Sequence, residues 1–118
     1  MRILYIALAG VAGTLARYGL EGWFQGRAGT LAVNLTGSLA LGFILRYATG
    51  SMVVSPDVRA ALTIGFCGAF TTMSTFSYES VALLRDGDYW RAGVYMGATI
   101  VGCLIAVALG TALANRLL

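Results

Sequence analysis

Five hydroxyl side chains fall within seven consecutive residues of the segment 65–77, which reads GFCGAFTTMSTFS. They are Thr71, Thr72, Ser74, Thr75 and Ser77. Hydroxyl groups can bond to backbone carbonyls and amides that a helix leaves unpaired. Gly65 and Gly68 precede them and weaken a helix, because glycine is conformationally free. The combination predicts an interruption in the middle of a long apolar segment.

An interrupted helix inside a membrane leaves carbonyls and amides without partners, and each such group is costly in lipid. Interruptions are tolerated where they line a cavity, bind an ion or pack against another protein element. The alternative is an uninterrupted helix in which each hydroxyl bonds the carbonyl four residues earlier. Thr72, Thr75 and Phe76 share one helical face, and Met73, Phe76 and Ser77 cluster similarly. This mixture is unusual for a lipid-facing surface and favours the interruption.

The overall composition is that of a membrane protein. Hydrophobic residues make up 58% of the 118 residues and charged residues 11%, whereas about a quarter of the residues in soluble domains are charged. Glycine occurs 16 times and proline once, which suits apolar helices that pack closely in lipid. The length corresponds to one domain. We therefore predict a single all-α transmembrane domain over residues 1–118.

Four apolar segments predict four membrane-spanning helices, at about residues 3–20, 31–47, 58–84 and 90–113. Each is near the roughly 20 residues that a bilayer crossing requires. Arginine and aromatic residues mark their ends, as is typical of the membrane interface. Segments 21–29, 49–57 and 85–88 are the expected connections, with Ser55 as N-cap and Pro56 as first residue of the third helix. A secretory leader is disfavoured because the first apolar stretch continues to Arg17.

Arginine is balanced between the two sides of the membrane in this topology. The side of both termini holds Arg2, Arg46, Arg59 and Arg116, and the other side holds Arg17, Arg27, Arg85 and Arg91. Orientation normally follows an asymmetry of Lys and Arg. Either other signals set one orientation, or both orientations occur and pair as an antiparallel homodimer. Four short helices are too thin to enclose a pore, which favours pairing.

Several functional classes are excluded by what the chain lacks. It has no histidine, no cysteine cluster and no paired carboxylates, so neither an enzyme nor a structural zinc site is expected. Cys67 and Cys103 both lie in apolar runs and are predicted to be buried free thiols. The net charge of +3 is dispersed among the helix ends, so no nucleic-acid partner is expected.

The string GAFTTMSTFS, residues 68–77, resembles the signature of the Fluc fluoride channels, also called the CrcB family, which reads roughly G-G-x-T-T-F-S-T-F-S. The likeness extends to Gly10 and Gly13, to Arg17-Tyr18, to VNLTGSLALGF at 33–43 and to Glu79. The loops and the last helix match by pattern only. This resemblance implies four transmembrane helices with a broken third helix, assembled as an antiparallel dual-topology homodimer in the cell inner membrane.

The resemblance also implies the function. Family members export toxic cytoplasmic fluoride passively, through two pores per dimer. A structural sodium ion at the dimer centre is held by backbone carbonyls at positions that match Gly68 and Thr71. Carbonyls freed from a helix are hard oxygen ligands, and the cation's charge offsets part of the cost of the break.

Further residues match the family's fluoride pore and vestibule. The pore positions are Asn34, Met73, Ser74, Thr75, Phe76, Tyr95 and Thr99, and the vestibule positions are Arg17 and Glu79. Hydroxyls, amides and aromatic ring edges can replace the water around fluoride. Simpler structural roles remain open: Asn34 as interhelical glue, Tyr95 in packing, Thr99 bonded to its own helix, Arg17 as an interfacial anchor and Glu79 as a solvated helix-end charge.

The chain departs from the family at Met73, where the signature has phenylalanine. Methionine is flexible and has no ring edge. Three interpretations follow: the channel works with the substitution, it conducts poorly, or it pairs with a second, different subunit.

Two rival functions remain at this point. A small dual-topology multidrug exporter would need a proton-exchanging carboxylate within the membrane. The first, second and fourth predicted helices contain none, and Glu79 is off centre in the third. The other rival is an assembly subunit that does not transport.

Overall fold

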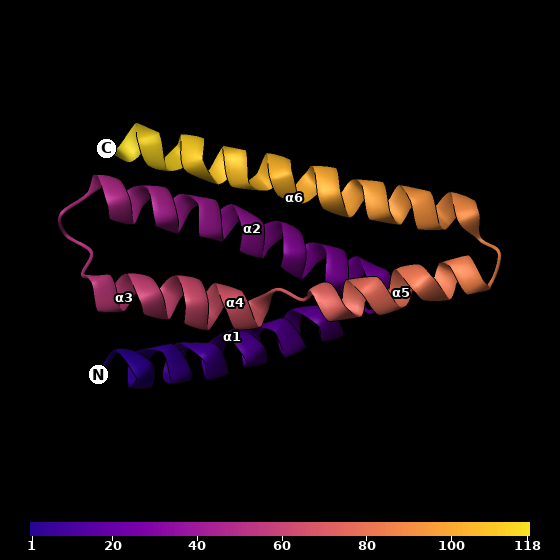
Figure 1. Cartoon of the computed structure of the whole chain (residues 1–118), viewed down its shortest axis with the longest axis horizontal. Helices are drawn as coiled ribbons and strands as arrows, with labels where there is room; N and C mark the ends of the chain where they lie inside the picture. The colour runs from indigo at the N-terminus through magenta and orange to yellow at the C-terminus, as the bar shows by residue number, and fades with distance from the viewer.

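Four apolar runs form antiparallel helical crossings, and the third crossing is divided (Figure 1). The computed structural model describes residues 1–118. The undivided crossings are α1 (Arg2–Phe24), α2 (Gly26–Gly50) and α6 (Tyr89–Leu117). The third crossing consists of α3 (Pro56–Ala60), a π-helix η1 (Ala61–Cys67), α4 (Gly68–Phe70) and α5 (Met73–Arg85). The first three pieces of that crossing follow one another directly, so residues 56–70 are one helical run.

The helices are longer than predicted, and the expected connection at 21–29 is wrong. Only Gln25 separates α1 from α2, with φ at 49°, and Gly26 follows with φ at 62°. Glycine adopts this left-handed conformation without strain, so the chain reverses within two residues. A Cβ on Gly29 would lie 3.0 Å from the Cα of Glu21, so α1 and α2 are in backbone contact directly beside the turn that joins them. The polar residues of this segment therefore form helix ends rather than a loop.

The boundaries of the third crossing follow the predicted signals. Ser55 caps α3 by accepting a hydrogen bond from the Val58 amide at 3.2 Å, and Pro56 is the first helical residue. The turn after α5 contains Gly87 with φ at 75°, and Asp88 then caps α6. Local sequence determines these ends because caps and left-handed glycines satisfy backbone groups that a helix leaves unpaired.

Glycines bring the helices into close contact. A Cβ on Gly110 of α6 would collide with the Leu39 carbonyl of α2, and one on Gly42 of α2 would collide with the Val107 carbonyl of α6. On the other side of the bundle, a Cβ on Gly13 of α1 would collide with the Phe66 carbonyl of η1. Small residues at these crossings allow backbone-to-backbone packing, which is how apolar helices associate in lipid.

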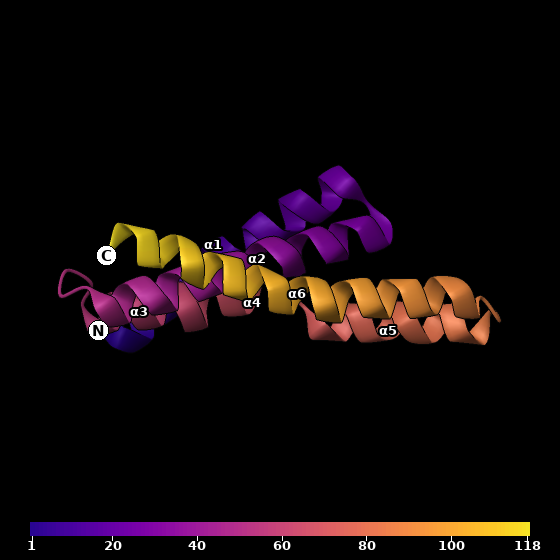
Figure 2. The same cartoon turned by 90° about the horizontal axis from the view of Figure 1, so that it is seen from above.

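The bundle is thin and exposes most of its apolar surface. It measures 51 × 30 × 20 Å, and only 20 of 118 residues are buried. The helices α1, α2 and α6 are each long and apolar enough to cross a membrane. Both termini lie at the same end of the bundle (Figure 1), and α1 is inclined to α6 rather than parallel to it (Figure 2). The prediction of an all-α membrane protein with a broken third helix is confirmed.

The contact between α2 and α6 can be tested at Gly110. Gly110→Ala places a methyl group against the Leu39 carbonyl, so we expect the free energy of unfolding in detergent to fall by about 1–3 kcal/mol, the usual cost of overpacking. Gly93 lies on the same helix and a Cβ there would meet no atom within 4 Å. Gly93→Ala is therefore the control and should leave stability unchanged or slightly raised. Equal losses from both substitutions would contradict the packing described.

Candidate functional site

The interruption of the third crossing is formed by two extended residues. Thr71 has φ −89° and ψ 159°, and Thr72 has φ −147° and ψ 110°. Thr72 also begins α5, because its hydroxyl accepts a hydrogen bond from the Thr75 amide at 3.2 Å. At 1.5 Å per residue, the helical run before the break is roughly 22 Å long and α5 roughly 20 Å. The break therefore lies near the middle of this crossing.

Two neighbouring helices supply the hydrogen bonds that the break lacks. Asn34 of α2 accepts from the Thr72 amide at 2.8 Å and donates to the Thr72 carbonyl at 3.1 Å. Arg17 of α1 donates from Nε to the Ala69 carbonyl at 3.0 Å. The guanidinium thus lies at the carboxyl end of α4, where the helix dipole favours a positive charge.

Two further carbonyls at the break, those of Gly68 and Thr71, receive no hydrogen bond from Asn34 or Arg17. The Thr71 amide and hydroxyl both donate to Cys67, at 3.1 and 3.0 Å, and the Thr72 amide donates to Asn34. Neither amide reaches the Gly68 carbonyl, and no hydrogen bond within the chain reaches the Thr71 carbonyl. The chain has no group of three or more His, Cys, Asp or Glu side chains that could hold a metal ion. The unpaired carbonyl oxygens of Gly68 and Thr71 are of the kind that hard cations bind.

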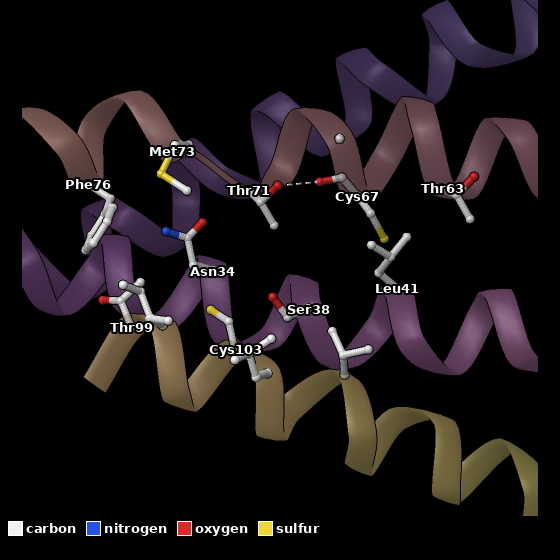
Figure 3. Close-up of a pocket in the computed structure, with 14 residues that line it drawn as sticks. Asn34, Ser38, Leu41, Thr63, Cys67, Thr71, Met73, Phe76, Thr99 and Cys103 are labelled. Carbon is white, nitrogen blue, oxygen red and sulfur yellow. Dashed lines mark hydrogen bonds between the residues drawn. The ribbon is translucent and has the colours of Figure 1, made fainter. Parts of the chain in front are cut away.

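A groove of about 430 Å³ lies beside the break, between α2, the third crossing and α6 (Figure 3). Six of the residues predicted from the sequence line it: Asn34, Gly68, Thr71, Met73, Phe76 and Thr99. The Met73 side chain is 71% exposed, whereas Asn34 and Phe76 are buried. The groove thus has a closed inner wall and an open side at the start of α5.

The remaining predicted pore residues lie next to the groove without lining it. Ser74 and Thr75 form a hydroxyl cluster with Thr72, with oxygen–oxygen distances of 3.3 and 3.1 Å. The ring of Tyr95 packs against Phe76 with centroids 5.4 Å apart and the planes tilted by 51°. A tilted pair turns the edge of one ring toward the face of the other.

Tyr95 also forms hydrogen bonds with two other residues predicted from the sequence, Glu79 and Thr99. Its hydroxyl donates to Glu79 Oε1 at 2.9 Å, and its carbonyl accepts from the Thr99 hydroxyl at 2.8 Å. Glu79 is therefore hydrogen-bonded to α6 and half-buried. The Thr99 hydroxyl is bonded to its own helix, and the side chain still borders the groove.

The structure adds groove residues that were not predicted from the sequence to belong to a functional site. They are Ser38, Leu41, Thr63, Cys67, Ile100, Cys103, Leu104 and Val107. Helical spacing could have found some of them: Ser38 lies four residues after Asn34, and Cys103 four residues after Thr99. Cys67 is buried as predicted and Cys103 is half-buried, and both thiols are free.

Arg17 and Glu21 correct two inferences made from the sequence. Arg17 was counted at the end of a crossing, but it reaches the break in mid-crossing. The first predicted helix was said to contain no interior acid, but α1 continues to Phe24 and includes Glu21. The Glu21 side chain is only 29% exposed, and its Oε1 lies 4.0 Å from Arg17 Nη1.

Comparison with known proteins identifies the family. The family model described as "CrcB-like protein, Camphor Resistance (CrcB)" matches residues 4–111. The chain belongs to the CrcB-like family. As a member, it is a multi-pass integral protein of the bacterial inner membrane.

Relatives of similar length are named fluoride-specific ion channel FluC. The fluoride-specific ion channel FluC of Geotalea uraniireducens (strain Rf4) is 44% identical over 121 residues, covering 98% of each chain. That of Pelobacter propionicus (strain DSM 2379 / NBRC 103807 / OttBd1) is 46% identical over 121 residues, 98% of this chain and 94% of the relative. That of Sorangium cellulosum (strain So ce56) is 44% identical over 124 residues, 99% and 97% of the two chains.

The contact between Arg17 and the break of this CrcB-like protein can be tested by stability. Arg17→Gln removes the guanidinium from the Ala69 carbonyl, so we expect the free energy of unfolding in detergent to fall by about 1–3 kcal/mol. Arg91→Gln is the control because that side chain is 70% exposed and pairs only with Asp88. A loss of stability from Arg91→Gln as large as that from Arg17→Gln would contradict a specific role at the break.

Proposed function

We propose that this chain forms a passive, fluoride-selective channel that exports cytoplasmic fluoride and relieves its toxicity. The observation that carries the proposal is the break at Thr71–Thr72, which places two helix ends and a cluster of hydroxyls beside a groove in mid-crossing. Membership of the CrcB-like family and relatives named fluoride-specific ion channels support it. The reaction is transport down a gradient, and no catalytic step is involved.

The two helix ends at the break have opposite polarity. The amino end of α5 presents backbone N–H groups and a partial positive charge, which favours an anion. The hydroxyls of Ser74 and Thr75 lie within the first turn of that helix. A fluoride ion that loses its water needs such donors, and the ring edge of Phe76 at the groove adds a weakly positive one. These groups would together replace the hydration of the ion.

Met73 lines the proposed pathway with a more flexible side chain than the phenylalanine of the family signature. Its side chain lines the groove and is 71% exposed. The thioether can move aside but cannot offer a ring edge. Phe76, held against Tyr95, is therefore the aromatic group that we expect to matter most.

An antiparallel, dual-topology homodimer is part of the proposal. The bundle is only 20 Å thick, and residues around the break such as Gly68, Met73 and Ser74 are exposed in the single chain. A second copy in the opposite orientation would cover this face and enclose the groove. Arginine is nearly balanced between the two sides of the membrane, four against three once Arg17 at the break is left out, which supports insertion in both orientations.

Sodium is the structural ion that we propose at the break. The carbonyls of Gly68 and Thr71 suit a hard cation, since no amide of the break donates to them. When bound, the ion would neutralise part of the negative charge at the carboxyl end of α4. Two copies of the chain would supply two such pairs of oxygens.

Fluoride efflux from liposomes that contain only this chain tests the function. We expect rapid release, a loss of at least tenfold for Phe76→Ile, and release by Met73→Phe at least as fast as the unmodified protein, because a ring edge is removed or added. Phe24→Ile is the control, since that ring is 48% exposed at the end of α1. Absence of fluoride release from every well-folded version would refute the channel, and release only with a second subunit would refute the homodimer.

Dual topology predicts labelling from both sides of the membrane. Ser51→Cys, in a background with Cys67→Ala and Cys103→Ala, places one thiol in the turn between α2 and α3. An impermeant maleimide applied to intact cells should label about half of the molecules, and the rest should react after permeabilisation. Labelling confined to a single side would rule out the antiparallel arrangement.

A further inference from the structure

Asn34 binds both peptide groups that flank Thr72. Its Oδ1 accepts from the Thr72 amide at 2.8 Å, and its Nδ2 donates to the Thr72 carbonyl at 3.1 Å. The side chain comes from α2 and only 7% of the residue is exposed. These two bonds fix the planes of two successive peptide units, so Thr72 cannot rotate about its own φ and ψ without breaking one of them.

The first of these peptide units contains the Thr71 carbonyl. In a trans peptide the C=O and the N–H point in opposite directions, and the chain has no cis peptide bond. Because the Thr72 N–H points at Asn34, the Thr71 carbonyl must point away from α2. That carbonyl receives no hydrogen bond from the chain. The side chain on α2 thus sets the direction of an oxygen on the third crossing.

We propose that Asn34 is a positioning residue that aims the Thr71 carbonyl at a bound cation. The inference rests on the proposed function, which places sodium on the carbonyls of Gly68 and Thr71. One N–H of the carboxamide is already used by the Thr72 carbonyl and its oxygen by the Thr72 amide. Asn34 therefore lines the groove and also orients the cation site, because the peptide unit between Thr71 and Thr72 carries both the N–H that it binds and the Thr71 carbonyl.

The sodium dependence of fluoride efflux distinguishes a role of Asn34 in orienting the Thr71 carbonyl from a general structural role. In liposomes with sodium titrated against N-methyl-D-glucamine, Asn34→Leu should raise the half-activating sodium concentration about tenfold, as expected when one interior hydrogen bond is lost. Efflux at saturating sodium serves only to normalise each titration, because Asn34 also lines the groove and its loss lowers the maximal rate. The control, Thr36→Val, removes a hydroxyl bonded within α2 and should change neither value.

Asn34→Asp is the second variant and keeps an acceptor for the Thr72 amide while losing the donor to the Thr72 carbonyl. Its half-activating sodium concentration should stay within about threefold of the unmodified value. A tenfold rise in this variant would overturn the inference. So would reduced efflux of Asn34→Leu at every sodium concentration with an unchanged half-activating value.

Amide hydrogen exchange gives a readout that needs no transport. In sodium-free detergent, Asn34→Leu should speed exchange of the Thr72 amide about tenfold and leave the Thr75 amide unchanged, because that amide is bonded to the Thr72 hydroxyl. Unchanged exchange at Thr72 would overturn the inference. Failure of the unmodified protein to release fluoride at any sodium concentration would instead refute the proposed function, and the exchange result would still decide whether Asn34 holds the peptide.

Discussion

The pairing of the Thr72 peptide groups with Asn34 is the interaction on which the rest of the site depends. Backbone groups in the hydrocarbon region need partners inside the protein, because lipid offers none. Thr71 and Thr72 are extended and cannot use the helix ladder, so α2 provides a carboxamide with the same donor and acceptor as a peptide. Arg17 completes the arrangement from α1 at the Ala69 carbonyl. The break is thus a structure built by three helices.

This constraint explains how one short segment can favour ions of both signs. The carbonyls at the end of α4 carry partial negative charge, and the amides at the start of α5 carry partial positive charge. In water such charges are screened, but between helices in a membrane they act over short distances at low dielectric. The proposed cation on the carbonyl side and the proposed passing anion on the hydroxyl side are compatible for this reason, and broken helices serve ions in other membrane proteins in the same way.

Close glycine contacts bring the helices around the break together, and the resulting bundle is only 20 Å thick. Backbone packing at Gly42 and Gly110 holds α2 beside α6, and packing at Gly13 holds α1 beside η1. Such contacts bring polar side chains within reach of a neighbouring backbone without burying a large core. The face that carries the break stays exposed in the single chain, which gives the proposed second copy a surface to cover.

The sequence by itself determined the class of protein, the four crossings and the presence of the break. Composition excludes a soluble core, apolar length sets the crossings, and Ser55, Pro56 and Gly87 mark local ends whose geometry needs no distant partner. The reach of α1 to Phe24 escaped this reasoning, because the apolar pattern stops at Leu20 and the ion pair of Glu21 with Arg17 is visible only in the structure.

Only the tertiary structure decided which groups satisfy the break. Hydroxyl spacing indicated where the helix stops, but the partners Asn34 and Arg17 lie 38 and 52 positions away from the groups they bond, so helix packing had to bring them together. Asn34 was predicted as a pore residue from the resemblance alone. Its two hydrogen bonds to the Thr72 backbone are visible only once α2 lies beside the third crossing. Local propensity can weaken a helix, whereas long-range hydrogen bonds are what make its interruption stable in lipid.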